Sequence, residues 1–110
     1  MPRTMTLDKE TFVLLPAQEY QDLLARAHGV EMPEYPKADK QGHRPARAFG
    51  LASIAREIIT RRLAAGWTQE QLAQKAGVRV ETLSRIERAK HHPQQATLAK
   101  IEQVFTKAGA

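Results

Sequence analysis

The stretch TQEQLAQKAGVRVETLSRIE, residues 68–87, decides the fold of this chain. It is polar overall, yet its few apolar and small residues recur at helical intervals around a single glycine, Gly77. Thr68 is a favourable N-cap, and Gln71 three residues later completes the spacing of a capping box, so a helix is predicted to begin here. Gly77 predicts that this helix ends after about two turns. A second short helix is predicted from about residue 79 to residue 88.

Two short helices can cross tightly only if a small residue lies at their contact and the turn between them allows a positive φ angle. Ala73 supplies the small contact, and Gly77 supplies the turn. The apolar residues available to bury the pair are Leu72, Ala76, Val78, Leu83 and Ile86. The polar residues of the second helix then remain on an open face. This is the spacing of a helix-turn-helix, whose open face enters the major groove of DNA.

Helical periodicity continues on both sides of this pair. A preceding helix, which should stop near Gly66, is predicted from apolar residues that share one side: Leu51, Ile54, Ile58, Ile59 and Leu63. A final helix is predicted after Pro93, from about residue 95 to residue 106, with an inner side of Leu98, Ile101, Val104 and Phe105. The predicted fold class is therefore all-α.

The first thirty residues form a different kind of segment. A short β-prone run from Phe12 to Leu15 is followed by Pro16, which fits the first turn of a helix. That helix should carry an apolar stripe of Ala17, Tyr20, Leu24 and Ala27, with Leu23 beside it, and should stop near Gly29. Residues 31–46 contain three prolines and one glycine without an apolar period, which is typical of an extended linker. We therefore divide the chain into a strand-helix segment (1–30), a linker (31–46) and a helical domain (47–110).

Several classes of function are disfavoured by what the sequence lacks. Without cysteine there is no disulfide and no thiolate nucleophile or metal ligand. The four histidines have no spaced carboxylate partners, Ser53 and Ser84 lack a nucleophile elbow, and no glycine-rich phosphate loop is present. We expect no catalytic site, no metal and no cofactor. No run is long and apolar enough for a membrane span or a secretory signal, so a cytoplasmic protein is predicted.

Positive charge is concentrated in the part of the chain that contains the helix pair of residues 68–87. Residues 1–46 hold 6 basic and 7 acidic residues, a net charge of −1, whereas residues 47–90 hold 9 basic and 4 acidic residues, a net charge of +5. A polyanion-binding surface needs such a field, although a basic face can also be merely solvated.

The sequence RRLAAGWTQEQLAQKAGVRVETLSRIERAK, followed by ATLAKIEQVF, resembles the phage-repressor-like helix-turn-helix group, also called the Cro/C1 or XRE family. The resemblance covers roughly residues 52–106 and implies a lambda-repressor-like domain of four to five helices that binds double-stranded operator DNA. Two departures matter. Ala89 replaces the glycine that usually follows the S-R-I-E turn, so the recognition helix is expected to end less sharply or to continue into the loop. The chain also ends where many relatives have a fifth helix that helps them to dimerise.

The resemblance implies roles for individual residues. The expected DNA contacts are Gln69, Arg79, Val80, Glu81, Thr82, Arg85 and Lys90. Arg85 could pair with guanine and Val80 could touch a thymine methyl group, whereas Lys90 would face phosphate. Gln69 and Glu81 could instead be ordinary polar residues of a first helical turn. Arg62 and Glu87 match a partly buried structural ion pair. A homodimer is expected, with its interface in either IEQVFTKAGA or the amino-terminal segment.

The amino-terminal arrangement resembles antitoxins of type II toxin-antitoxin modules, and VLLPAQEYQDLL is similar to the start of antitoxins of the Phd and HigA kinds. The implied function is a repressor that neutralises a small basic toxin of the RNase type and autoregulates its operon, bound to operator on the bacterial nucleoid. The residues expected to bind the toxin are Phe12, Leu15, Tyr20, Leu23 and Leu24. Two alternatives stay open. In the first, the segment only pairs with its copy in a homodimer of a stand-alone phage-type regulator. In the second, the helical domain binds protein instead of DNA.

Overall fold

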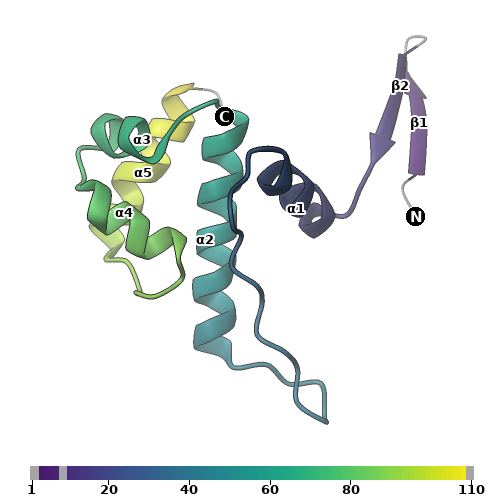
Figure 1. Cartoon of the computed structure of the whole chain (residues 1–110), viewed down its shortest axis with the longest axis horizontal. Helices are drawn as coiled ribbons and strands as arrows, with labels where there is room; N and C mark the ends of the chain where they lie inside the picture. Colours follow the sequence, from purple (N-terminus) through teal and green to yellow (C-terminus); the bar gives the residue numbers. More distant parts are fainter. Residues whose placement is uncertain (1–2, 8–9, 109–110) are drawn as a thin grey trace.

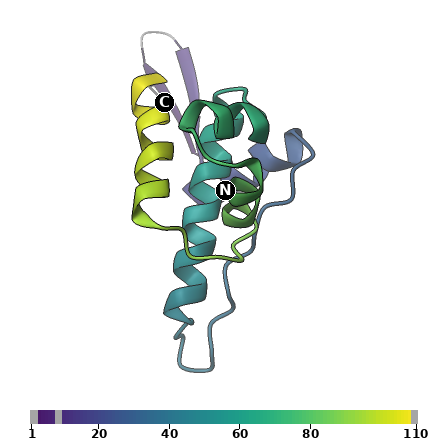
Figure 2. The ribbon, with the colours of Figure 1, turned by 90° about the vertical axis from the view of Figure 1, so that its left-hand side faces the viewer.

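The computed structural model describes residues 3–7 and 10–108 (Figure 1). Its elements in chain order are β1 (Arg3–Leu7), β2 (Glu10–Leu14), α1 (Ala17–Ala27), α2 (Ala46–Ala64), α3 (Gln69–Ala76), α4 (Val80–Glu87) and α5 (Gln95–Ala108). The long helix α2 lies at the centre, with α3, α4 and α5 on one side and α1 on the other. Figure 2 shows α5 running beside α2. The predicted all-α helix-turn-helix domain is confirmed.

The core lies between α2 and the three helices that follow it. Its buried members are Ile58, Leu72, Ala73, Ala76, Leu83, Ile86, Ile101 and Phe105. Each of the large apolar side chains contributes roughly 1.5–3 kcal/mol when it is removed from water. Leu98 and Val104 of α5 are only partly buried and pack against this cluster. The inner sides predicted for α3, α4 and α5 therefore meet in one core, whereas of the side predicted for α2 only Ile58 belongs to this core and Ile54 packs against it.

The predicted cap and turn of the helix pair are both present. The Thr68 hydroxyl accepts a hydrogen bond from the Gln71 N–H at 3.1 Å, and the Gln71 side-chain oxygen accepts one from the Thr68 N–H at 2.8 Å. Gly77 has a φ angle of 70°, in the left-handed region where a Cβ atom is strained. The N–H of Val78 donates to the carbonyl of Ala73 at 3.0 Å, which closes a Schellman motif at the end of α3.

The expectation for the end of α4 was wrong. The helix stops at Glu87. Ala89 has a φ angle of 56°, so an alanine adopts the left-handed conformation that the usual glycine would adopt at this position. The Ala89 N–H donates to Ile86 at 3.0 Å and the Lys90 N–H donates to Arg85 at 3.2 Å, both to backbone carbonyls. These two bonds make the same Schellman motif as at Gly77 and enforce a sharp stop despite the side chain.

The amino-terminal strand has a partner that the sequence did not reveal. Strand β2 pairs antiparallel with β1, with Arg3 opposite Leu14 and Leu7 opposite Glu10. The strand predicted over Phe12–Leu15 is thus part of a hairpin, which stands clear of the helices in Figure 1. Pro16 occupies the N-cap of α1 rather than its first turn.

Helix α1 packs on α2 through a polar face rather than through its apolar stripe. Gln21 and Ala25 are its buried residues. Tyr20 and Leu23 are 46% and 47% exposed, while Leu15 and Leu24 are half-buried. The side chain of Phe12 lies outside the described residues. Apart from the half-buried Leu24, the stripe predicted from periodicity is therefore open to solvent along the outer side of α1.

The segment between α1 and α2 follows the surface of α2. The carbonyl of Pro33 accepts a hydrogen bond from Arg56 at 2.8 Å, and the ring of Tyr35 stacks on that of Phe49 with centroids 4.7 Å apart. A linker expected from its composition is therefore attached to α2 at two points. None of the helices in the described part of the chain is long and apolar enough to cross a membrane.

Candidate nucleic-acid interface

The candidate recognition surface consists of α3, α4 and the loop that follows α4. Helix α4 buries Leu83, Ile86 and Glu87, and this fixes which of its faces is open. Glu81 and Arg85 lie one helical turn apart on the open face and are exposed. Their side chains can therefore reach a ligand without disturbing the core.

The residues expected to contact DNA fall into two groups by exposure. Arg79, Glu81, Arg85 and Lys90 are exposed, whereas Gln69, Val80 and Thr82 are half-buried. Val80 packs against the core cluster, which leaves only part of its side chain available for an apolar contact with a base. Arg79 precedes α4 with extended backbone, at φ −73° and ψ 144°, and takes the N-cap position.

Behind this surface lies a buried ion pair between α2 and α4. The Arg62 Nε and Nη2 atoms donate to the two carboxylate oxygens of Glu87, each at 2.9 Å. The two residues are 5% and 4% exposed. The Arg62 Nη1 atom donates to the Trp67 carbonyl at 3.0 Å, and the Gln69 amide donates to Glu87 at 2.9 Å. Because a buried charge is tolerated only when it is paired, this network fixes α4 relative to α2 and α3.

This network also defines the setting of Gln69. Its side-chain nitrogen is bound to Glu87, so the amide is held at the start of α3 in one orientation. The carbonyl end of the same group is the part that can accept hydrogen bonds. Gln69 thus joins the ion pair to the recognition surface.

A groove beside α4 extends the recognition surface toward α5. It is lined by Thr82, Arg85, Ile86, His91, His92, Pro93, Gln94 and Thr97. Arginine, histidine and glutamine side chains donate hydrogen bonds to phosphate oxygens or base edges. Lys90 precedes His91 of this groove in the sequence. The surface therefore carries both hydrogen-bond donors and positive charge.

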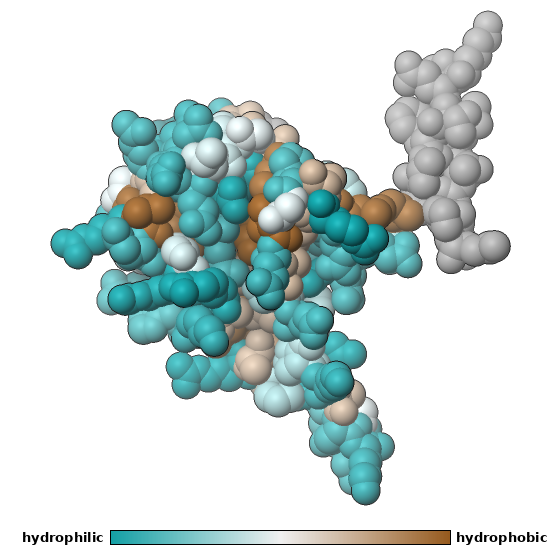
Figure 3. Space-filling view, viewed as in Figure 1, coloured by the Kyte–Doolittle hydropathy of each residue, from teal (hydrophilic) through white to brown (hydrophobic). Residues whose placement is uncertain are grey.

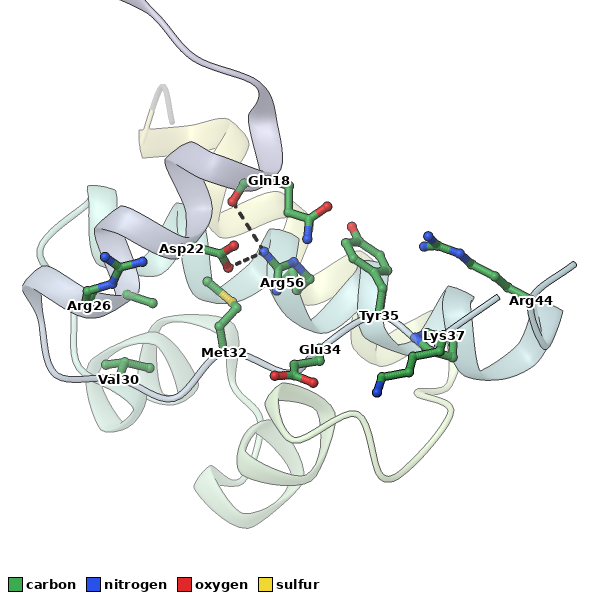
Figure 4. A pocket seen from close by; sticks show the side chains of 12 residues that line it. Gln18, Asp22, Arg26, Val30, Met32, Glu34, Tyr35, Lys37, Arg44 and Arg56 are labelled. Atoms are coloured by element: carbon green, nitrogen blue, oxygen red, sulfur yellow. Dashed lines mark hydrogen bonds and ion pairs between the residues drawn. The ribbon is translucent and has the colours of Figure 1, made fainter. Parts of the chain in front are cut away.

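A second polar cluster, which the sequence analysis missed, lies on the other side of α2 and is shown in Figure 4. Arg56 is only 2% exposed. Its guanidinium donates to Asp22 at 2.6 Å, to Gln21 at 3.0 Å and to the Pro33 carbonyl at 2.8 Å, and it lies 5.0 Å from the centroid of the Tyr35 ring. Arg56 therefore joins α1 and the linker to α2.

The signal for this cluster was present in the pattern of α2. Arg56 lies four residues after Ala52 and three before Ile59, both buried, so it belongs to a second buried stripe around the helix. A buried arginine requires a partner that accepts its hydrogen bonds. The acidic and amide side chains of α1 are groups that can do so.

No group of three or more histidine, cysteine, aspartate or glutamate side chains that could hold a metal ion occurs in the part of the chain that the structure describes. The arrangement of α3 and α4 is suited to insertion into a groove of DNA.

Comparison with known proteins agrees with this geometry. A family model described as helix-turn-helix matches residues 58–107, from the second half of α2 almost to the end of α5. The matched part is slightly less than half of the chain. It contains both helices of the recognition surface and supports a DNA-binding transcription regulator of the XRE type, a family of DNA-binding regulators rather than of enzymes. No curated protein and no solved structure matches the chain.

Proposed function

We propose that this protein is a sequence-specific transcriptional repressor and the antitoxin of a type II toxin-antitoxin module. The repressor half of the proposal rests on the match over residues 58–107 and on the open face of α4. The antitoxin half rests on one observation: the amino-terminal arm (residues 3–7 and 10–27) presents exposed apolar side chains on the side that does not pack on α2.

On the DNA side, the exposed residues of α4 read base edges. Arg85 pairs with guanine, and Arg79, Glu81 and Thr82 contact neighbouring bases or hold Arg85 in place. Val80 offers the accessible part of its side chain to a thymine methyl group. Gln69 and Lys90 bind the phosphate backbone on either side and set the register of the domain on the duplex.

On the partner side, Tyr20 and Leu23 are the centre of the contact. Large apolar side chains in contact with water favour burial against a partner, and tyrosine and leucine at helical spacing are typical of a helix that lies in a groove. Leu15 and Phe12 extend the contact toward the hairpin, and Leu24 extends it along α1. The partner is a small basic protein, such as an RNase toxin, for which the net charge of −1 over residues 1–46 is suitable.

The repressor acts as a homodimer on a palindromic operator in the bacterial cytoplasm. One small helix-turn-helix unit binds only weakly, and a two-fold protein matches two half-sites about one helical turn apart. Dimerisation also places two amino-terminal arms near one operator, so that toxin and DNA can bind the same complex.

The proposal is tested by expressing the full chain, tagged at its carboxy terminus, together with the genes beside it in its host. Mass spectrometry should find a small basic protein in stoichiometric amount, and this protein should be absent when Tyr20 and Leu23 are both replaced by glutamate. Gel-shift measurements with the upstream promoter should give a specific complex. A promoter shift without a partner protein would leave a stand-alone regulator, and a partner without a shift would remove the repressor function.

A further inference from the structure

The linker passes beside the carboxyl end of the recognition helix. The linker residues 31–34 line one cavity of about 670 Å³ together with Glu87, Arg88 and Lys90. These two segments lie more than fifty positions apart in the sequence, so the fold alone brings them together. The loop on one side of the cavity is the loop assigned above to the phosphate backbone.

The two walls of this cavity carry opposite charges. Arg88 and Lys90, on the recognition side, are both exposed. Glu31 and Glu34, on the linker side, are exposed as well. Glu87 is buried and already bound by Arg62, so its charge is balanced within the core. The linker therefore supplies the acidic wall of the cavity.

The acidic wall is fixed in position because Arg56 holds the linker from beneath. Arg56 donates a hydrogen bond to the carbonyl of Pro33, and Pro33 lies between Glu31 and Glu34 in the sequence. The guanidinium is itself held by Asp22 of α1, and Tyr35 packs between Arg56 and Phe49. Glu31 and Glu34 thus belong to an ordered surface and do not lie on a freely moving tether.

We propose that Glu31 and Glu34 form an electrostatic brake on DNA binding. Their carboxylates lower the positive potential at Lys90 and Arg88 and repel a phosphate that approaches this loop. The effect extends over about 10 Å at 0.1 M salt, which is the distance over which exposed charges act on one another. This inference rests on the proposed DNA-binding function and concerns how strongly that surface holds the DNA backbone.

The size of the brake follows from Coulomb's law in water. Removing one exposed carboxylate at this range should tighten binding by about twofold, and removing both by about fourfold. Because the contact is to phosphate, the gain should not depend on base sequence. It should also fade as salt is raised, since salt screens both the carboxylates and the phosphates.

The test measures binding of the full chain to a fluorescein-labelled duplex of mixed sequence by fluorescence anisotropy at low salt. The variant is Glu31→Gln combined with Glu34→Gln. The matched control is Glu19→Gln combined with Glu57→Gln, which removes the same charge from exposed positions on α1 and α2 outside this cavity. Thermal melting followed by circular dichroism should show the same midpoint for all three proteins.

The brake predicts an affinity gain of about fourfold for the cavity variant and a clearly smaller gain for the control. In a Lys90→Gln background the gain should shrink, because the phosphate no longer approaches the cavity closely. An equal gain in cavity variant and control, or an undiminished gain without Lys90, would overturn the proposal. Absence of DNA binding by the unaltered chain would instead reject the DNA-binding function on which it rests.

Discussion

At the scale of single residues, Ala89 carries strain that glycine would relieve. Its φ angle of 56° is in the left-handed region, where an L-residue with a Cβ atom is disfavoured by roughly 1–2 kcal/mol. Glycine also gains more freedom in the unfolded chain, which offsets part of this difference. We expect Ala89→Gly to raise the free energy of unfolding by about 0.5–1 kcal/mol, measured by urea denaturation.

The control for this substitution is Ala65→Gly. Ala65 also caps a helix, α2, but has right-handed backbone with a φ angle of −81°. Glycine gains nothing there and should destabilise the protein by up to about 1 kcal/mol. The same sign for both substitutions would show that the backbone at Ala89 is not strained.

Two ion pairs of similar geometry should contribute differently to the free energy of unfolding. Arg62 and Glu87 are buried, whereas Arg61 binds Glu102, which is exposed, at 2.9 Å. Glu87→Gln leaves a buried guanidinium without its counter-charge and should cost about 3 kcal/mol in the free energy of unfolding. Glu102→Gln should cost less than about 1 kcal/mol, because water screens the exposed carboxylate. Equal losses in chemical denaturation would argue that burial does not determine the strength of these pairs.

Arg85 and Lys90 should separate base recognition from phosphate binding. Arg85→Ala should reduce affinity for the operator by about 1–3 kcal/mol and relax the preference at one base pair. Lys90→Ala should weaken binding to all sequences about equally and lower the salt dependence of the affinity. The measurement is binding to a set of operator duplexes with single substitutions. A uniform loss in Arg85→Ala would place the recognition face elsewhere.

At the scale of elements, the sequence predicted the helix pair well because its signals are local. Thr68, Gln71 and Gly77 act within a few residues of themselves: the side chains of Thr68 and Gln71 form the cap, and Gly77, without a Cβ atom, accepts the left-handed turn. Ala89 was expected to weaken the end of α4, but the backbone hydrogen bonds from Ala89 to Ile86 and from Lys90 to Arg85 outweigh the conformational preference of one residue.

The contacts of the amino-terminal half could not be predicted in the same way. The buried stripe of α2 indicates that Arg56 needs a partner, but its partners Asp22 and Gln21 lie 34 and 35 residues away, and no local pattern specifies which residues they are. Strand β1 was missed because only Met5 and Leu7 mark its five residues as apolar. The positions of the candidate DNA contacts followed from the helix pair, whereas the acidic wall of the linker depends on the packing of distant segments.

Substitutions on the outer side of α1 should leave the fold intact. Tyr20 and Leu23 are nearly half exposed, so replacing both by glutamate should alter the free energy of unfolding by no more than about 0.5 kcal/mol per residue. DNA affinity should stay within about twofold, while binding of the proposed toxin is lost. Melting curves and pull-downs measure the two effects on the same preparation. A large loss of stability would mean that this side of α1 is covered within the chain or by its copy.

At the scale of the whole molecule, the chain is more extended than its length requires. The radius of gyration is 15.7 Å, against about 13 Å for a compact domain of this size. The hairpin stands apart from the helices and so extends the molecule. The face of the molecule in Figure 3 is mainly hydrophilic, with small hydrophobic patches. A two-stranded hairpin is only marginally stable alone, and its outer edges can pair with a further strand.

The buried guanidinium of Arg56 also determines where the protein can be divided. The domain boundary predicted from composition lies after residue 46. Cutting the chain there would remove all three of the hydrogen-bond partners Asp22, Gln21 and the Pro33 carbonyl from Arg56. Residues 47–110 expressed alone would then carry an arginine on a newly uncovered apolar surface beside Ala52 and Ile59. A fragment made for crystallisation should therefore begin before α1, because α1, the linker and the helical domain share one interior.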